Sequence, residues 1–195
     1  VFVSKVTSKS STAIQNLRAS NDLISFIAEK EGFLSHYERD QMAYDPVPTI
    51  GYGVVVYPGD IFYNSLTKNE AYAWLVKEVN EGAYTSAVNR FSKNNNIKIN
   101  QYQFDALVSF SYNLGTGWTY GGWDIYDLLT SYSDLNHVNK TKLVNTFAVY
   151  HHAGGQLYWG LYYRRIDEAE MFLKGDYISD GYNNKYGFNI STCCV

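Results

Sequence analysis

Residues 29–53 constrain the fold of this chain more than any other segment, because they join an apolar helix to two short strands. Apolar residues recur at helical spacing across residues 23–28, behind Ser20, a residue type that caps helix N-termini. Gly32, which is typical of a helix end, follows Glu31 directly. The sequence therefore predicts that Glu31 lies at a helix C-terminus. There the main-chain carbonyls and the helix dipole disfavour an ionised carboxylate, so that Glu31 can donate a proton.

The segment after Gly32 predicts a β-hairpin that carries a second acid and a threonine. Asp40 falls at the end of the first strand and Thr49 at the start of the second. Asp45 offers a further acid between them, although an Asp before Pro46 is typical of a turn. We prefer Asp40. If Asp45 were the second acid, only residues 46–48 would separate it from Thr49, and the two prolines among these three residues leave little room for a paired hairpin.

Three features of this segment resemble the signature of the phage-type lysozymes, the muramidases of glycoside hydrolase family 24. They are the Glu31-Gly32 pair, the eight residues that separate Glu31 from Asp40, and the TIGYG run at residues 49–53. Two features depart from the family pattern. The segment between Asp40 and Thr49 is longer than in the family, and Val54 stands where the family usually has a His.

Two later segments extend the resemblance over roughly residues 21–178. Residues 103–115 (QFDALVSFSYNLG) resemble the family's central buried helix, whose terminal amide side chain faces the cleft, here Asn113. Residues 160–172 resemble its arginine helix, and the resemblance implies that Arg164 pairs with the catalytic Glu. We expect Arg165 to point away from the cleft, because neighbouring helical residues face different directions.

The resemblance implies an α+β fold that is mainly helical and lysozyme-like. A small antiparallel β-hairpin or sheet lobe near the N-terminus would face a helical C-terminal lobe across a cleft. We expect a polar N-terminal extension at residues 1–20, a catalytic domain at 21–178 and a C-terminal tail at 179–195. Within the catalytic domain, the β-lobe covers about 32–64 and the helical lobe about 65–178.

The same resemblance implies an endo-acting hydrolase of bacterial peptidoglycan that cleaves the β-1,4 bond between N-acetylmuramic acid and N-acetylglucosamine. Glycoside hydrolysis requires one carboxylic acid to protonate the leaving oxygen and a second carboxylate to orient water or attack the sugar. Glu31 is the candidate acid, and Asp40 with Thr49 the candidate water-positioning pair, with Asp45 as the alternative to Asp40. Asn113 and Arg164 are the candidate supporting residues. We expect no cofactor and no metal.

Two other functions remain open on the sequence. A lytic transglycosylase needs one acid and no water-orienting Asp, and a non-catalytic peptidoglycan-binding relative would keep the fold while losing an acid or the Thr. The chain keeps Glu31, an Asp and Thr49. The products separate these functions, because hydrolysis leaves reducing ends and transglycosylation leaves 1,6-anhydro ends.

Composition narrows the class of partner. A formal net charge of −3, with 16 basic residues and no basic run, argues against nucleic acid. The sequence contains no stretch of eighteen apolar residues, so membrane insertion is not expected, and we expect a monomer.

Cys193 and Cys194 are adjacent and suggest no metal site or disulfide framework, and His151-His152 is expected at the surface or cleft edge. We expect action at the bacterial cell wall, after synthesis in a phage-infected host cytoplasm or after secretion.

The remaining pattern is helical. Thr67 with Glu70, and Asn100 with Gln103, have the spacing of capping boxes at helix starts. The helix after Asn100 carries apolar residues around most of its circumference, which predicts burial. Further helices are expected over the following ranges: 123–129, 141–150 and 164–173.

Overall fold

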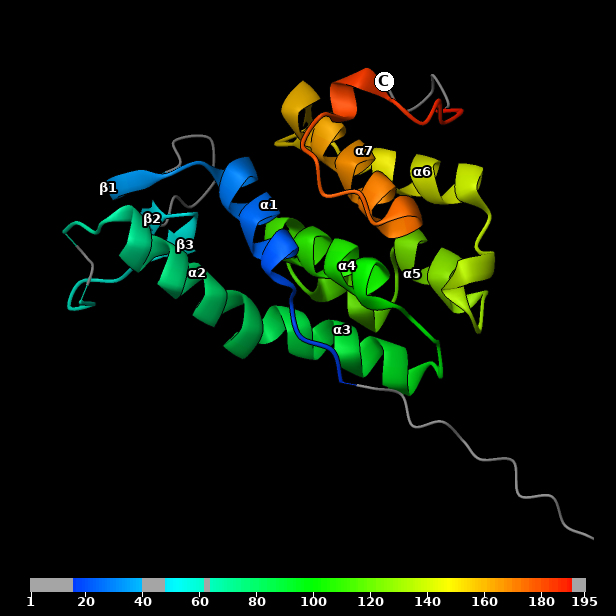
Figure 1. Cartoon of the computed structure of the whole chain (residues 1–195), viewed down its shortest axis with the longest axis horizontal. Coiled ribbons are helices and arrows are strands. Elements are labelled where there is room, and N and C mark those ends of the chain that lie inside the picture. The colour runs from blue at the N-terminus through cyan, green and yellow to red at the C-terminus, as the bar shows by residue number, and fades with distance from the viewer. Residues whose placement is uncertain (1–15, 40–47, 62–63, 191–195) are drawn as a thin grey trace, which may run out of the picture.

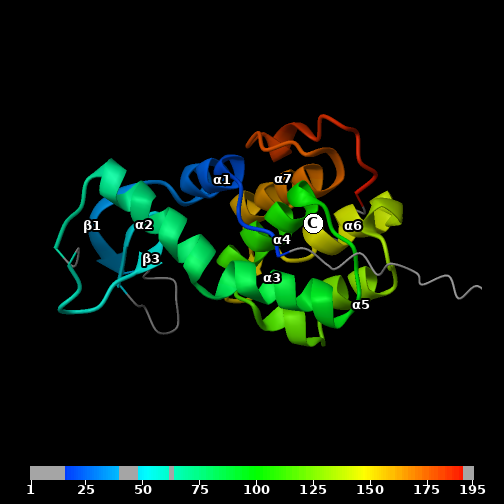
Figure 2. The same ribbon diagram turned by 60° about the horizontal axis from the view of Figure 1, so that its bottom comes forward.

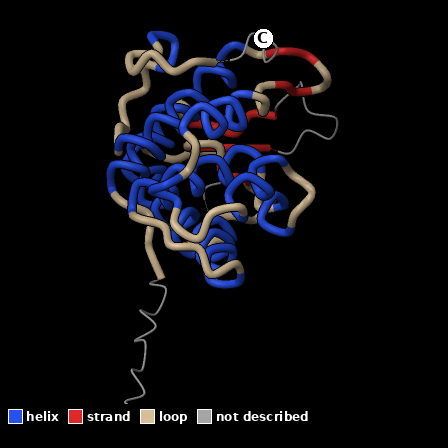
Figure 3. Tube along the Cα trace, turned by 90° about the vertical axis from the view of Figure 1, so that its right-hand side faces the viewer, coloured by secondary structure: helices blue, strands red, loops and turns tan. Residues whose placement is uncertain are grey.

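The computed structural model describes residues 16–39, 48–61 and 64–190, in which helices predominate and strands are short (Figure 3). Its α-helices are α1 (Asn21–Glu31), α2 (Lys68–Glu81), α3 (Ala83–Asn94), α4 (Gln101–Leu114), α5 (Asp124–Thr130), α6 (Lys140–Ala148) and α7 (Trp159–Lys174). Short 3₁₀ helices are η1 (Gly117–Tyr120), η2 (Leu135–His137) and η3 (Gly181–Asn183). The expected mainly helical α+β fold is confirmed.

A three-stranded antiparallel sheet follows α1, in the order β1 (Leu34–Arg39), β2 (Pro48–Gly51) and β3 (Val54–Val55). The predicted hairpin is therefore present as β1 and β2, and β1 ends directly before Asp40. Asp40 and Asp45 themselves lie outside the described residues, as do Cys193 and Cys194. A second hairpin, β4 (His152–Ala153) with β5 (Gln156–Leu157), precedes α7 and was not predicted.

The elements are arranged as a small sheet at one end of the molecule and a larger group of helices at the other (Figures 1 and 2). α2 packs on β2 and runs from the sheet to α3, which in turn packs against α4. α7 lies along α4 and also contacts α6. α1 leads from the helical group to the sheet, so its C-terminal end, where Glu31 lies, meets the junction between the two parts.

The main hydrophobic core surrounds α4, as its pattern predicts. Residues 103–111 of this helix are all buried, and the fully buried Trp118 donates its indole N–H to Ser111 Oγ over 2.9 Å. A second, smaller cluster lies between the sheet and α2 and consists of Ile50, Val56, Leu66 and Ala71. Each fully buried large apolar side chain contributes about 1.5–3 kcal/mol relative to its exposed state. These buried side chains stabilise the packing of α7 and α1 against α4.

The helix starts agree with their predicted caps. Ser20 Oγ accepts the Leu23 N–H at the start of α1. Both predicted capping boxes, at the starts of α2 and α4, are complete. α5 and α6 lie within one or two residues of their predicted ranges, whereas α7 begins at Trp159, five residues before the predicted start. Within the described ranges, no helix combines the length and the apolar character needed to cross a bilayer.

Candidate active site

Glu31 is the last residue of α1, as the sequence predicts. Gly32 ends the helix with a positive φ of 70° and donates its N–H to the Ala28 carbonyl over 3.2 Å. The Glu31 side chain is 21% exposed, so most of it is enclosed by protein while part of it meets solvent. A carboxyl group in this position can exchange a proton with a bound molecule.

Arg164 of α7 holds this carboxylate, which is the pairing that the resemblance implied. Its Nη1 lies 2.6 Å from Glu31 Oε1, and its Nε lies 3.3 Å from Glu168 Oε1. The Arg164 side chain is almost fully buried. Burial acts to lower the pKa of Arg164, but the carboxylates of Glu31 and Glu168 outweigh burial and the pKa rises. The guanidinium therefore stays charged and fixes the direction of the Glu31 side chain.

Arg165 does not point away from the site, and that prediction was wrong. Its side chain is fully buried, with Nη2 at 3.0 Å from both Asn113 Oδ1 and Glu168 Oε1. Burial lowers the pKa of Arg165 to about 10, against the attraction of Glu168. Ser109 Oγ donates to the same Glu168 oxygen over 2.7 Å. Two arginines and two glutamates thus form one charge-balanced network, which we call the Glu31 network, with Asn113 at its edge.

The turn between β2 and β3 covers Glu31 from the other side. A Cβ at Gly53, where φ is +77°, would lie 3.1 Å from Glu31 Oε2, so both the backbone conformation and the close approach favour glycine there. Tyr112 of α4 donates its hydroxyl to the Tyr52 carbonyl over 2.7 Å and so anchors this turn. Burial and then the nearby Glu31 raise the pKa of Tyr112. The sequence predicts that the helix carrying Tyr112 is buried but contains no signal for the contact of this residue with the turn.

The remaining predicted residues are placed as follows. Thr49 lies in the central strand β2, half-buried, and alternates with the buried Ile50. Thr49 therefore faces the opposite side of the sheet from the small hydrophobic cluster. Because Asp40 and Asp45 are outside the described residues, the choice between them stays a prediction. His151 is buried, against expectation, with Nδ1 against the Ala148 carbonyl.

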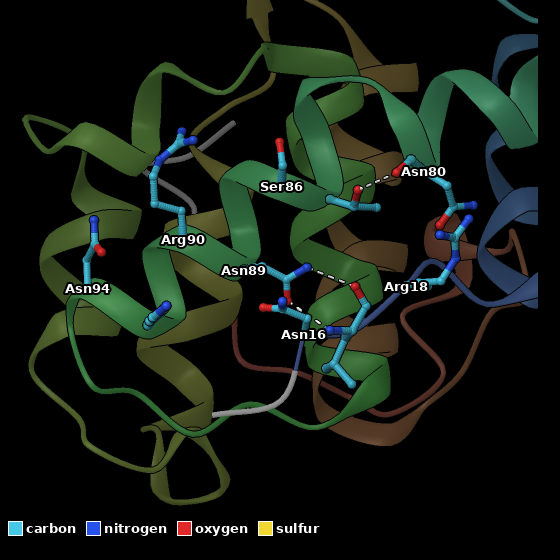
Figure 4. Close-up of a pocket in the computed structure, with 10 residues that line it drawn as sticks. Asn16, Arg18, Asn80, Ser86, Asn89, Arg90 and Asn94 are labelled. Carbon is cyan, nitrogen blue, oxygen red and sulfur yellow. Dashed lines mark hydrogen bonds between the residues drawn. The ribbon is translucent and has the colours of Figure 1, made fainter. Parts of the chain in front are cut away.

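A separate polar pocket of about 690 Å³ lies between residues 16–18 and the α2–α3 region (Figure 4). Asn89 points into it but is engaged, because its amide accepts the Leu17 N–H and donates to the Leu17 carbonyl, at 2.9 and 2.8 Å. Residues 16–18 precede α1, whereas Glu31 ends it. With 11 residues in α1, the helix ends lie about 15 Å apart, so this pocket is distinct from the Glu31 site.

Comparison with known proteins gives a family and a fold. The phage lysozyme family matches residues 28–168. The endolysin of Bacillus phage B103 is 34% identical over 140 residues, which are 69% of this chain and 48% of that endolysin. The endolysin of Lactococcus phage c2 is 31% identical over 150 residues, 74% of this chain and 58% of its own length. The chain thus spans about half the length of these relatives.

Two solved structures show the same fold. An endolysin from the Escherichia coli O157:H7 phage FAHEc1 superposes with a TM-score of 0.63 at 23% identity, over 84% of this chain and 98% of the other. The muramidase domain of SpmX from Asticaccaulis excentricus gives a TM-score of 0.60 at 24% identity, over 80% of this chain and 98% of that domain.

Proposed function

Because the chain belongs to the phage lysozyme family, we propose that it hydrolyses the glycan strands of bacterial cell-wall peptidoglycan. The bond cleaved is the β-1,4 link between N-acetylmuramic acid and N-acetylglucosamine. The observation that carries this proposal is the partly exposed Glu31 carboxyl, gripped by the buried Arg164 at the junction of the helices and the sheet. This placement gives an acid with one fixed direction and access to a bound molecule.

Glu31 acts as the general acid that protonates the leaving glycosidic oxygen. After the transfer Glu31 is a carboxylate, and the charge-assisted hydrogen bond from Arg164 stabilises that form. Arg164 also limits the rotamers of Glu31, so that the proton is presented in one orientation. The other contacts of the Glu31 network keep Arg164 itself from moving.

The second carboxylate is assigned to Asp40, with Thr49 as its partner in holding the attacking water. A threonine hydroxyl both donates and accepts, which suits a water that must be oriented and deprotonated. Such a pair inverts the anomeric configuration and places the second carboxylate about 6.5–9.5 Å from the Glu31 carboxyl. We propose a catalytic domain at residues 21–178 that acts as a monomer at the cell wall.

The first test compares Glu31→Gln with Glu29→Gln on purified peptidoglycan. Glu29 is the matched control, because it is an exposed glutamate on the same helix. Glu31→Gln keeps the shape of the side chain but delivers no proton, so turnover should fall by about 10²–10⁴-fold. Glu29→Gln should retain turnover. Equal activity of the two variants would remove Glu31 from the mechanism.

Mass spectrometry of the products tests the reaction type. Reducing N-acetylmuramic acid ends are expected, whereas 1,6-anhydro ends would assign transglycosylation and a lack of products would assign binding alone.

The second carboxylate is tested by measuring the peptidoglycan turnover of Asp40→Asn and Asp45→Asn side by side. We expect Asp40→Asn to be the inactive variant, and the reverse result would assign the water-positioning role to Asp45.

A further inference from the structure

Three carboxyl groups meet where the chain folds back after α7. Asp167 and Glu170 lie one turn apart on α7, and Asp180 directly precedes η3. One oxygen from each of the three lies within 4.8 Å of the others. The Asp180 main-chain N–H donates to Asp167 Oδ1 over 3.0 Å, and a Cβ at Gly181 would lie 2.9 Å from that same oxygen. We call Asp167, Glu170 and Asp180 the acidic triad.

Glu170 has no partner for its carboxylate among the residues that the structure describes. The residue is fully buried, and neither of its oxygens accepts a hydrogen bond there. Asp180 Oδ1 also accepts no hydrogen bond in the described part of the chain. A buried carboxylate without compensation is strongly disfavoured, so a buried acid is normally found protonated, ion-paired or bound to a metal. Glu170 also points at the other two acids, and their negative charges further disfavour its ionised form.

The charges around the triad do not balance. Lys30 contacts Asp167, and Lys185 lies 3.4 Å from Asp180 Oδ1 and 2.6 Å from Asp176 Oδ2. With all four carboxylates ionised, the triad and Asp176 carry four negative charges against these two lysines, which is a net charge of −2. Burial, followed by the charges of Asp167 and Asp180, raises the pKa of Glu170 to about 7.

We propose that the acidic triad binds one hard divalent cation, for which calcium has the best fit. Carboxylate oxygens are the ligands that such cations prefer, and a charge of +2 cancels the local excess. Oxygens that share one calcium ion at 2.3–2.6 Å lie at most about 5 Å apart, a limit that the triad meets. Magnesium requires oxygens within about 4.2 Å and nearly octahedral geometry, which three carboxylates from two segments satisfy less easily.

The contacts of Asp167 are compatible with a cation. Its Oδ2 faces Lys30 and its Oδ1 accepts main-chain N–H groups, but each carboxylate oxygen has two acceptor positions. Lys30 directly precedes Glu31, and Asp167 follows Arg164 by one turn of α7. The cation site therefore borders the Glu31 network without sharing a residue with it. A bound ion fastens the segment after α7 to that helix.

The test measures calcium binding and its effect on unfolding in the full chain. Protein stripped with EDTA and dialysed is titrated with CaCl₂ by calorimetry, and its Tm is recorded with and without the metal. One site is expected. Calcium at about 100 times its Kd should raise the ratio of folded to unfolded protein about 100-fold. MgCl₂ should have the smaller effect.

Glu170→Gln is the decisive variant, because it removes the buried charge and keeps the side-chain volume. It should lose calcium binding and the calcium-dependent rise in Tm, while its metal-free Tm equals or exceeds that of the metal-free wild type. Asp180→Asn, at the more exposed member of the triad, should also weaken binding and serves if Glu170→Gln does not fold. Asp127→Asn, at an exposed acid of α5, should bind like the wild type.

Two results overturn the proposal. If calcium neither binds to the wild type nor raises its Tm, the buried Glu170 carboxyl is neutralised by a proton and not by a cation. If Glu170→Gln and Asp180→Asn bind calcium as the wild type does, the ion binds elsewhere.

Discussion

Replacing Arg164 with Met should destabilise the protein substantially, although the side-chain volume is nearly kept. Arg164 is almost fully buried between Glu31 and Glu168. Breaking a buried ion pair by removing one partner costs about 3–5 kcal/mol, because the other charge is left uncompensated. Here Glu31 is 21% exposed and can be rehydrated, and Glu168 keeps Arg165 and Ser109. We therefore expect the lower end, about 3 kcal/mol in the free energy of unfolding.

A double-mutant cycle isolates the Glu31–Arg164 contact from the rest of this cost. Glu31→Gln alone leaves the buried Arg164 with one carboxylate partner, Glu168. Arg164→Met alone removes the cation that pairs with Glu31. In the double variant neither charge remains, so the two losses should not add. The coupling energy should be about 1–3 kcal/mol, as for contacting residues of one network.

Urea unfolding followed by circular dichroism gives the four free energies. The matched control is Arg90→Met, because Arg90 is exposed and contacts only Tyr120 among the interactions that the structure gives for it. That change should cost less than about 1 kcal/mol. Equal costs for Arg164→Met and Arg90→Met, or additive effects of Glu31→Gln and Arg164→Met, would refute the view that Arg164 compensates a buried charge.

Three further predictions concern the turn over Glu31 and the acidic triad. Gly53→Ala should lower both peptidoglycan turnover and stability, the latter by about 1–2 kcal/mol, because φ is positive and the new Cβ meets Glu31; Gly154→Ala, with positive φ but open space, should lower stability alone. Tyr112→Phe should cost about 1 kcal/mol in urea unfolding and reduce turnover, because the β2–β3 turn loses its anchor; unchanged turnover would show that the anchor is dispensable. In EDTA, the free energy of unfolding should fall by about 2 kcal/mol as pH rises from about 5 to 7, because folded Glu170, with its pKa near 7, binds a proton that the unfolded chain has released. Glu170→Gln should lack this fall, and identical pH profiles would contradict the argument.

The helix ends could be predicted because their signals are local. A cap needs only a side chain and an N–H two or three residues further on, as at Ser20, Thr67 and Asn100. The helix end at Glu31 is equally local, because the residue that ends the helix, Gly32, is adjacent in sequence. The early start of α7 at Trp159 has no such signal, since Tyr158 at its N-cap makes no side-chain capping bond.

The direction of Arg165 could not be predicted from adjacency. Neighbouring residues of a helix are about 100° apart, so one of them faces solvent only when the helix has an exposed face at that level. α7 has none there, because residues 164–172 are all buried. The rule for surface helices therefore failed on a helix that other elements surround. The contact of Tyr112 with the turn was equally hidden, because it joins residues 60 positions apart.

Residues 164–172 of α7 are all buried, and the buried charges in the first and second halves of this stretch are compensated in different ways. Five of its buried residues are ionisable: Arg164, Arg165, Asp167, Glu168 and Glu170. The Glu31 network resolves the first half, because the charges of its two arginines and two glutamates cancel. The second half has Lys30 as the close partner of Asp167, and Glu170 has none among the described residues. Because a helix buried in this way tolerates charge only where it is compensated, the contrast between the two halves is the physical reason to look for a cation at the second.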